Sequence, residues 1–304
     1  MSRLLRAVHV LRCPALRADE LGVLARVSQL TSAHEAQLAT VDVHVNADST
    51  AAPEFLARTE FLFDERRWSR PAMDAEFSKL AADAGATHAS LRVQTDAKPR
   101  VAVLVSHLDH CLTELLHRWD GGELDVDISC VVSNHARERS SHLRQFCERK
   151  NVNFFYVPAG GPARPGQLRS HEPAVLSLIS RNSDFVVLAR FMQILSSRFL
   201  RELGKDVINI HHGLLPSFKG AHPYRQAYNA GVKVIGATAH FVTEELDCGP
   251  IIEQQVARVS HRDTVAQFAE KSRSLEKSCL FQAVKLYSEA RVVRSGNGRV
   301  VVLQ

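Results

Sequence analysis

The sequence predicts an α/β protein of two domains, a small ferredoxin-like α+β domain followed by a larger domain with a mostly parallel sheet. The chain has 304 residues, which is long enough for two domains. Residues 4–93 carry apolar patterns in the order βαββαβ, the ferredoxin-like arrangement. From residue 100, continuous apolar runs alternate with amphipathic segments, as in parallel sheets covered on both faces. We therefore expect domains at 1–95 and 100–304, joined by the polar linker 96–99.

In the first domain, alternating apolar residues indicate strands and a spacing of three to four residues indicates helices. Cys13-Pro14 ends the first strand, and Asp19 is the expected N-cap of the first helix. The expected strands are 5–12, 37–45, 55–63 and 89–93, and the expected helices are 21–33 and 72–84.

In the second domain, strands and helices alternate up to residue 210, and a short helix and further strands follow. Asp263 is the expected N-cap of the last long helix, and Asn297-Gly298 is a hairpin turn. The expected strands are 101–105, 126–132, 153–157, 185–188, 207–210, 238–241 and 251–259, with a final hairpin of 291–294 and 299–303. The expected helices are 110–119, 139–150, 173–180, 196–203 and 264–290.

The composition narrows the class of protein. With 45% hydrophobic and 23% charged residues, it is typical of soluble globular chains. No apolar run approaches the roughly 20 residues of a membrane helix. The net charge of +5 comes without a dense Lys/Arg run, so an anionic small molecule is expected as a partner and a nucleic acid is not. Six cysteines without a CxxC pair favour a reduced compartment.

The first residues allow two interpretations of location. Four arginines, the last of them Arg17, precede the first acid, Asp19, which is typical of a mitochondrial transit peptide. Alternatively, residues 7–11 are the first strand of the first domain, which the following pattern requires. We expect a cytoplasmic protein, with a mitochondrial one as the alternative.

Polar residues at strand ends and in loops predict a site in the stretch 206–256. Asn209 and His211 end an apolar strand, and Asp247 lies in an acidic loop. Ligands of parallel sheets bind at the carboxyl ends of the strands. His211 and His212 could instead be a metal pair, but no third ligand stands at useful spacing, so no metal is expected.

The same stretch resembles the folate-dependent formyltransferase family. The motif reads Asn209-Ile210-His211, Leu214-Leu215-Pro216, Lys219-Gly220 and Asp247-Cys248-Gly249, and residues 106–112, 133–135, 188–195 and 221–228 agree as well. The resemblance spans nearly the whole chain. It implies a Rossmann-like formyltransferase domain and 10-formyltetrahydrofolate as the substrate, with no separate cofactor.

The chemistry of these residue types agrees with that resemblance. Moving a formyl group passes through a tetrahedral oxyanion, which fixed hydrogen-bond donors stabilise. Asn209 is a suitable donor, Asp247 can orient and deprotonate water, and His211 can pass a proton to the departing N10. The carboxylate of Asp247 would favour the imidazolium form of His211. These three residues are the expected catalytic group.

The resemblance also implies where the folate binds. The stretch 188–195, which follows the strand 185–188, would be the pterin pocket. The expected substrate-binding residues are Arg190, Met192, Ile194, Leu195, Leu215, Pro216, Gly220 and His240.

The turn at 106–111 indicates the acceptor. Relatives that formylate glycinamide ribonucleotide have a glycine-rich turn there, which holds a phosphate. Here the turn has no glycine, and Asp109 would repel a phosphate. We therefore expect hydrolysis to formate and tetrahydrofolate, which supplies formate for purine synthesis and balances the one-carbon folate pool. The alternative is transfer of the formyl group to an amine such as glycinamide ribonucleotide.

The first domain resembles ACT domains, small regulatory modules that often bind amino acids. Cys13-Pro14 matches their usual turn, whereas Ala15 and the late Gly22 depart from it. The resemblance implies an amino-acid effector and a homo-oligomer, a dimer or tetramer. Because the turn departs from the pattern, a purely structural or dimerising role is the alternative. The strands 37–45 and 55–63 are the expected pairing edges.

Overall fold

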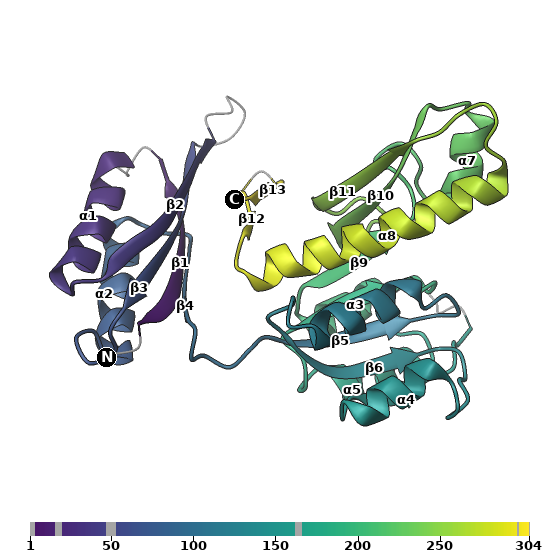
Figure 1. Ribbon diagram of the computed structural model, residues 1–304, viewed down its shortest axis with the longest axis horizontal. Helices are drawn as coiled ribbons and strands as arrows, with labels where there is room; N and C mark the ends of the chain where they lie inside the picture. The colour runs from purple at the N-terminus through teal and green to yellow at the C-terminus, as the bar shows by residue number, and fades with distance from the viewer. Residues whose placement is uncertain (1–3, 16–19, 47–52, 162–165, 297, 304) are drawn as a thin grey trace. The chain divides into compact units, whose positions relative to one another are not determined.

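The computed structural model describes residues 4–15, 20–46, 53–161, 166–296 and 298–303. The chain forms two compact units, one of Met1–Ala97 with Ala290–Gln304 and one of Lys98–Glu289 (Figure 1). The first has an antiparallel sheet and the second a mostly parallel sheet, so the predicted fold class is confirmed.

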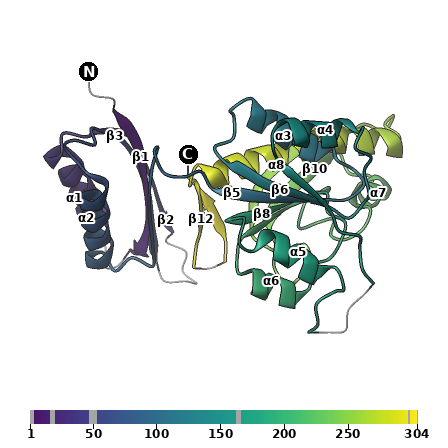
Figure 2. The ribbon, with the colours of Figure 1, turned by 90° about the horizontal axis from the view of Figure 1, so that it is seen from below.

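The sheet of the first unit has helices on one face. Its order is β2-β3-β1-β4, and α1 and α2 lie side by side against it (Figure 2). Phe61, Trp68 and Phe77 are buried and stack in the core between these layers. Asp19, the expected cap of α1, lies outside the described residues. The elements are β1 (Leu5–Pro14), α1 (Glu20–Ala33), β2 (Gln37–Asn46), β3 (Glu54–Phe63), α2 (Arg70–Asp83) and β4 (His88–Val93).

The C-terminal hairpin, β12 (Val292–Arg294) and β13 (Val300–Val302), belongs to this first unit. Val293 and Leu303 form a buried apolar cluster with Val10 and Leu56, on the sheet face opposite the helices. The prediction that all of 100–304 forms one domain is therefore corrected. The reason is apolar burial, because two strands have little core of their own and the uncovered sheet face provides one. Of the predicted turn, Asn297 lies outside the described residues.

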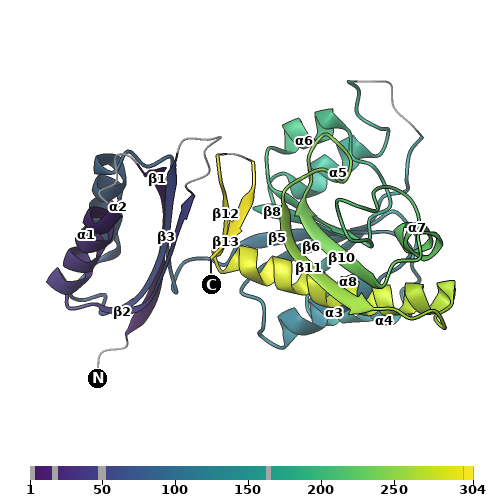
Figure 3. The same ribbon diagram turned by 90° about the horizontal axis from the view of Figure 1, so that it is seen from above.

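The second unit is a seven-stranded sheet of order β11-β10-β9-β8-β5-β6-β7. The strands β9, β8, β5, β6 and β7 run parallel to one another. β10 runs antiparallel to both of its neighbours, β9 and β11. Helices α3, α4 and α8 cover one face, and α5 and α6 cover the other (Figure 3). The strands are β5 (Arg100–Val105), β6 (Asp127–Ser133), β7 (Asn153–Tyr156), β8 (Phe185–Ala189), β9 (Val207–His211), β10 (Val234–Phe241) and β11 (Ile251–Arg258). The helices are α3 (His110–Asp120), α4 (His142–Arg149), α5 (Glu172–Ile179), α6 (Ser197–Leu203), α7 (Pro223–Asn229) and α8 (Val265–Ser288).

Helix α8 begins one residue later than expected. Thr264 is its N-cap, and Thr264 with Gln267 forms a capping box. Asp263 instead accepts hydrogen bonds from the Ser260 amide and from Lys271, so the N-cap prediction was wrong. Over the described residues, no helix is both long and apolar enough to cross a membrane.

Candidate active site

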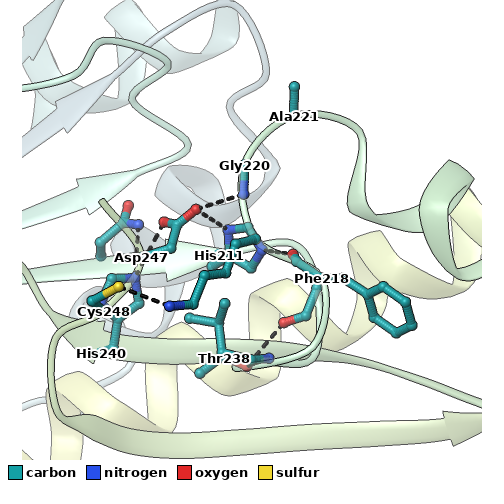
Figure 4. Close-up of polar contacts among 12 residues, drawn as sticks. His211, Phe218, Gly220, Ala221, Thr238, His240, Asp247 and Cys248 are labelled. Carbon is teal, nitrogen blue, oxygen red and sulfur yellow. Dashed lines mark hydrogen bonds and ion pairs between the residues drawn. The ribbon is translucent and has the colours of Figure 1, made fainter. Parts of the chain in front are cut away.

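The three residues predicted to be catalytic lie together at one edge of the sheet. Figure 4 shows His211 and Asp247 facing each other. Asn209 and His211 are two residues apart on β9, so both side chains point to the same face. The loop between β10 and β11 brings Asp247 back over this strand end. Its Oδ2 lies 3.4 Å from Nδ1 of His211. Neither side chain is more than 7% exposed, so their interaction is shielded from water.

The orientation of His211 is fixed by the loop that follows β9. Its Nε2 lies 2.6 Å from the carbonyl oxygen of Phe218. A carbonyl only accepts, so Nε2 carries a proton and donates it. The nitrogen that can exchange a proton is then Nδ1, which faces Asp247. A Cβ on Gly213 would lie 3.0 Å from Nε2, so glycine allows this close approach.

Asp247 is held in an uncommon backbone conformation. Its φ is 52°, in the left-handed region that residues with a Cβ sparsely populate. Its Oδ2 accepts a hydrogen bond of 2.9 Å from the amide of Gly220. Gly249 packs so tightly that a Cβ there would lie 1.7 Å from the carbonyl oxygen of Phe241. These contacts fix the carboxylate, and Oδ1 accepts no hydrogen bond from the described residues.

His240 orients Asn209, a link that the sequence did not reveal. Burial lowers the pKa of His240, which makes its ring neutral at pH 7. Its Nδ1 lies 2.9 Å from the Phe241 carbonyl oxygen, so Nδ1 donates and Nε2 is an acceptor. Asn209 Nδ2, 3.2 Å away, therefore donates to Nε2. One hydrogen on Nδ2 remains for a substrate oxygen.

A cavity of about 350 Å³ opens beside these residues, which we call the site cavity. Six of the eight residues predicted to bind substrate line it: Arg190, Met192, Ile194, Leu195, Gly220 and His240. Met192 and Ile194 are exposed and give it an apolar mouth. Leu215 and Pro216 are not among the described lining residues. Leu215 is instead buried, and its amide donates to Thr238 Oγ1.

The sequence also missed the loop before Asp247 as a wall of this cavity. Val242 to Leu246 line it together with Phe191. The acidic pair Glu244 and Glu245 was visible in the sequence, but no periodicity tells which residues of a loop turn inward.

A second hollow of about 500 Å³ lies at the turn after β5, which we call the first-turn cavity. Arg137 contributes to its lining and contacts Asp109 across 2.8 Å. The guanidinium also donates to the carbonyl oxygens of Ser106 and His107. The carboxylate of Asp109 is therefore neutralised, and the repulsion expected from it is corrected.

One group of side chains has metal-ligand types close together, namely His110, Cys111 and Glu276. Burial raises the pKa of the Cys111 thiol well above its usual value, which disfavours the thiolate that binds metals. Arg190 Nε lies 3.3 Å from the same Glu276 carboxylate. The guanidinium already supplies the positive charge that a metal ion would bring.

His212, next to the site, makes stability depend on pH. Burial lowers its pKa to about 2 from the ordinary 6.5. The unfolded chain therefore binds a proton below pH 6.5 that the folded chain does not bind. The contribution of His212 to the free energy of unfolding is therefore full above pH 6.5. Below pH 6.5 it falls by about 1 kcal/mol per pH unit. We expect His212→Gln to reduce the difference between urea unfolding at pH 7.5 and 5.5. The exposed His135→Gln should leave this difference unchanged, and an equal change in both variants would contradict the assignment.

Comparison with known proteins agrees with this geometry. The formyl transferase family model matches residues 99–284, so the fold and site define an enzyme with a formyl transferase domain. A mitochondrial formyltetrahydrofolate deformylase of Arabidopsis thaliana is 46% identical over 98% of this chain and 87% of its own. A crystal structure of such a deformylase from Pseudomonas syringae has a TM-score of 0.83 at 36% identity, covering 100% of this chain and 95% of its own. The chain belongs to the formyltetrahydrofolate deformylase family.

A solved transferase is a more distant relative. The glycinamide ribonucleotide transformylase 1 of Symbiobacterium toebii has a TM-score of 0.61 at 30% identity, and the match covers 71% of this chain and 98% of that one. The two kinds of enzyme thus share the domain that carries the site.

Proposed function

We propose that the protein hydrolyses 10-formyltetrahydrofolate to formate and tetrahydrofolate. The observation that carries this proposal is the joint placement of Asn209, His211 and Asp247 around the site cavity. The names of the full-length relatives support it. Formate released in this way would enter one-carbon metabolism and purine synthesis.

The geometry suggests how the residues divide the reaction. Asp247 Oδ1 takes a proton from water, and the hydroxide adds to the formyl carbon. The oxyanion accepts a hydrogen bond from the free Nδ2 hydrogen of Asn209, and one such donor is worth about 3–4 kcal/mol. The bond from carbon to N10 then breaks. The proton that Asp247 took from water passes from Oδ2 to His211 Nδ1 and on to N10, and the formic acid released loses its own proton to water. Formate and tetrahydrofolate result.

The direct test is formate release by the purified full chain from 10-formyltetrahydrofolate alone. We expect turnover without any amine in the assay. If the formyl group leaves only when glycinamide ribonucleotide is added, and appears on its amine, the protein is a transferase and the proposal is wrong. Amino acids added singly to the same assay would reveal an effector of the ACT-like unit by a changed rate.

The first unit is proposed to form a homodimer through β2. This strand is an edge of its sheet, and its apolar residues Leu38, Val41, Val43 and Val45 are 37–48% exposed. Edge strands with apolar side chains pair readily with another copy. The expected pairing through β3 was wrong, because β3 lies between β2 and β1.

We therefore expect Val43→Lys to convert a dimer into a monomer in light scattering at micromolar concentration. A lysine charge in the centre of the pairing edge would be desolvated without a partner. Thr40→Lys, on the other face of the same strand, is the control and should remain dimeric. A monomeric parent protein would contradict this proposal.

A cytoplasmic location is proposed, with the mitochondrion as the alternative. The Arabidopsis relatives carry the word mitochondrial in their names. Fractionation of cells that express the full chain distinguishes the two.

A further inference from the structure

The strongest unexplained feature is a buried charged cluster between the two cavities. Arg190 lines the site cavity, and His110 lines the first-turn cavity. Both contact Oε2 of Glu276 on α8, His110 Nε2 at 2.8 Å and Arg190 Nε at 3.3 Å. Ser272 Oγ donates to the other carboxylate oxygen at 2.9 Å. We call these four residues the partition.

The partition is fixed in place. Glu276 is 3% exposed and Arg190 is 8% exposed. Arg190 has a φ of 64°, a backbone conformation that residues with a Cβ keep only when their surroundings hold them in it. Its carbonyl oxygen accepts from the Ser106 amide, and Ser106 Oγ accepts from the Met192 amide. The loop that carries Arg190 is thereby joined to the turn after β5.

The proposed hydrolysis does not by itself require the partition. Water is small, and it reaches the formyl carbon within the site cavity alone. An amine carried on a larger molecule needs room beside that carbon for the rest of the molecule. The first-turn cavity lies at the same sheet edge. Arg190 of the site-cavity wall and His110 of the first-turn wall both contact Glu276, so these three side chains separate the two cavities.

We infer that the partition determines the acceptor: it keeps primary amines attached to a larger body away from the formyl carbon and leaves water as the acceptor. This inference rests on the proposed hydrolysis. It assigns Arg190 a role in specificity, whereas the sequence suggested a role in folate binding. The reaction that the partition prevents is ordinary formyl transfer. In it the amine nitrogen bonds to the formyl carbon, the bond to N10 breaks, and a proton of the amine goes to N10.

The test is the division of products from 10-formyltetrahydrofolate in the presence of glycinamide ribonucleotide, measured as formate and formylated amine by mass spectrometry. Arg190→Gly removes the guanidinium, and glycine accepts a φ of 64° without strain. We expect the parent protein to give formate with only a trace of formylated amine. In the variant the share of formylated amine should rise at least about tenfold, the scale of a change in pocket shape.

The division of products does not depend on how much of the variant is folded. Arg190→Gly removes one of the cations that contact Glu276. The second variant therefore combines Arg190→Gly with Glu276→Gln, and it should give the same rise in the share of formylated amine. His110→Ala, which shortens the partition from the other side, should give a smaller rise. Met192→Ala widens the site cavity at its mouth instead and is the control, with the division of products unchanged.

Three outcomes would overturn the inference. Formate alone from both Arg190 variants is one, and an equal rise in Met192→Ala is another. A raised KM for the folate with an unchanged division of products would make Arg190 a substrate-binding residue. A parent protein that formylates the amine readily would instead contradict the proposed hydrolysis, so the two failures are distinguishable.

Discussion

Asp247→Asn should lower kcat for formate release by about 10²–10⁴-fold, the range of a lost general base. Asparagine keeps the shape of the side chain and tolerates the left-handed backbone that Asp247 adopts. Its amide oxygen can still accept from Gly220, as Oδ2 does now. What is lost is the ability to take a proton from water and to hold a charge beside His211.

The measurement is single-turnover formate release together with the Kd for tetrahydrofolate. We expect the Kd to change little, because the apolar mouth of the site cavity is intact. Glu202→Gln is the control, since Glu202 is an exposed carboxylate outside the site cavity, paired with Arg198 on α6. Unchanged turnover in Asp247→Asn would remove Asp247 from the mechanism.

His211→Asn should also lower kcat by about 10²–10⁴-fold, because an amide donates hydrogen bonds but cannot exchange protons at neutral pH. The contact with Asp247 could persist, whereas the proton path from Asp247 Oδ2 through Nδ1 would be broken. Single-turnover formate release measures this loss. The folate Kd should again be nearly constant.

A matched control exists in the next loop. His222 is exposed and has a φ of 53°, and asparagine tolerates that conformation. His222→Asn should therefore keep full turnover. Unchanged turnover in His211→Asn would contradict proton exchange at His211.

Much of the site could be predicted because its residues follow from local pattern. Asn209 and His211 end one apolar strand, and the two-residue period of a strand puts both on one face. The contact between Asn209 and His240 could not be predicted, because it depends on the register of two antiparallel strands. A shift of one residue would turn His240 to the other face.

Loop residues were less predictable, because contacts with distant parts of the chain determine where they lie. Asp247 is placed by a left-handed backbone and by the packing of Gly249 against Phe241. Leu215 and Pro216 matched a family motif, but Leu215 is buried, and neither residue is among the described residues that line the site cavity. The cluster of Arg190, Glu276 and His110 joins residues up to 166 positions apart, and no spacing within one element reveals such a contact.

The C-terminal hairpin has a consequence for the order of events during synthesis. Ribosomes deliver the chain from its N-terminus, and domains fold as units when they are complete. The unit of Lys98–Glu289 is complete before the hairpin emerges, whereas the first unit needs Val293 and Leu303 to cover Val10 and Leu56. The first unit thus begins to be synthesised before the second but is complete only after it. Until the hairpin has emerged from the ribosome, an apolar face of its sheet is open to chaperones and to other nascent chains.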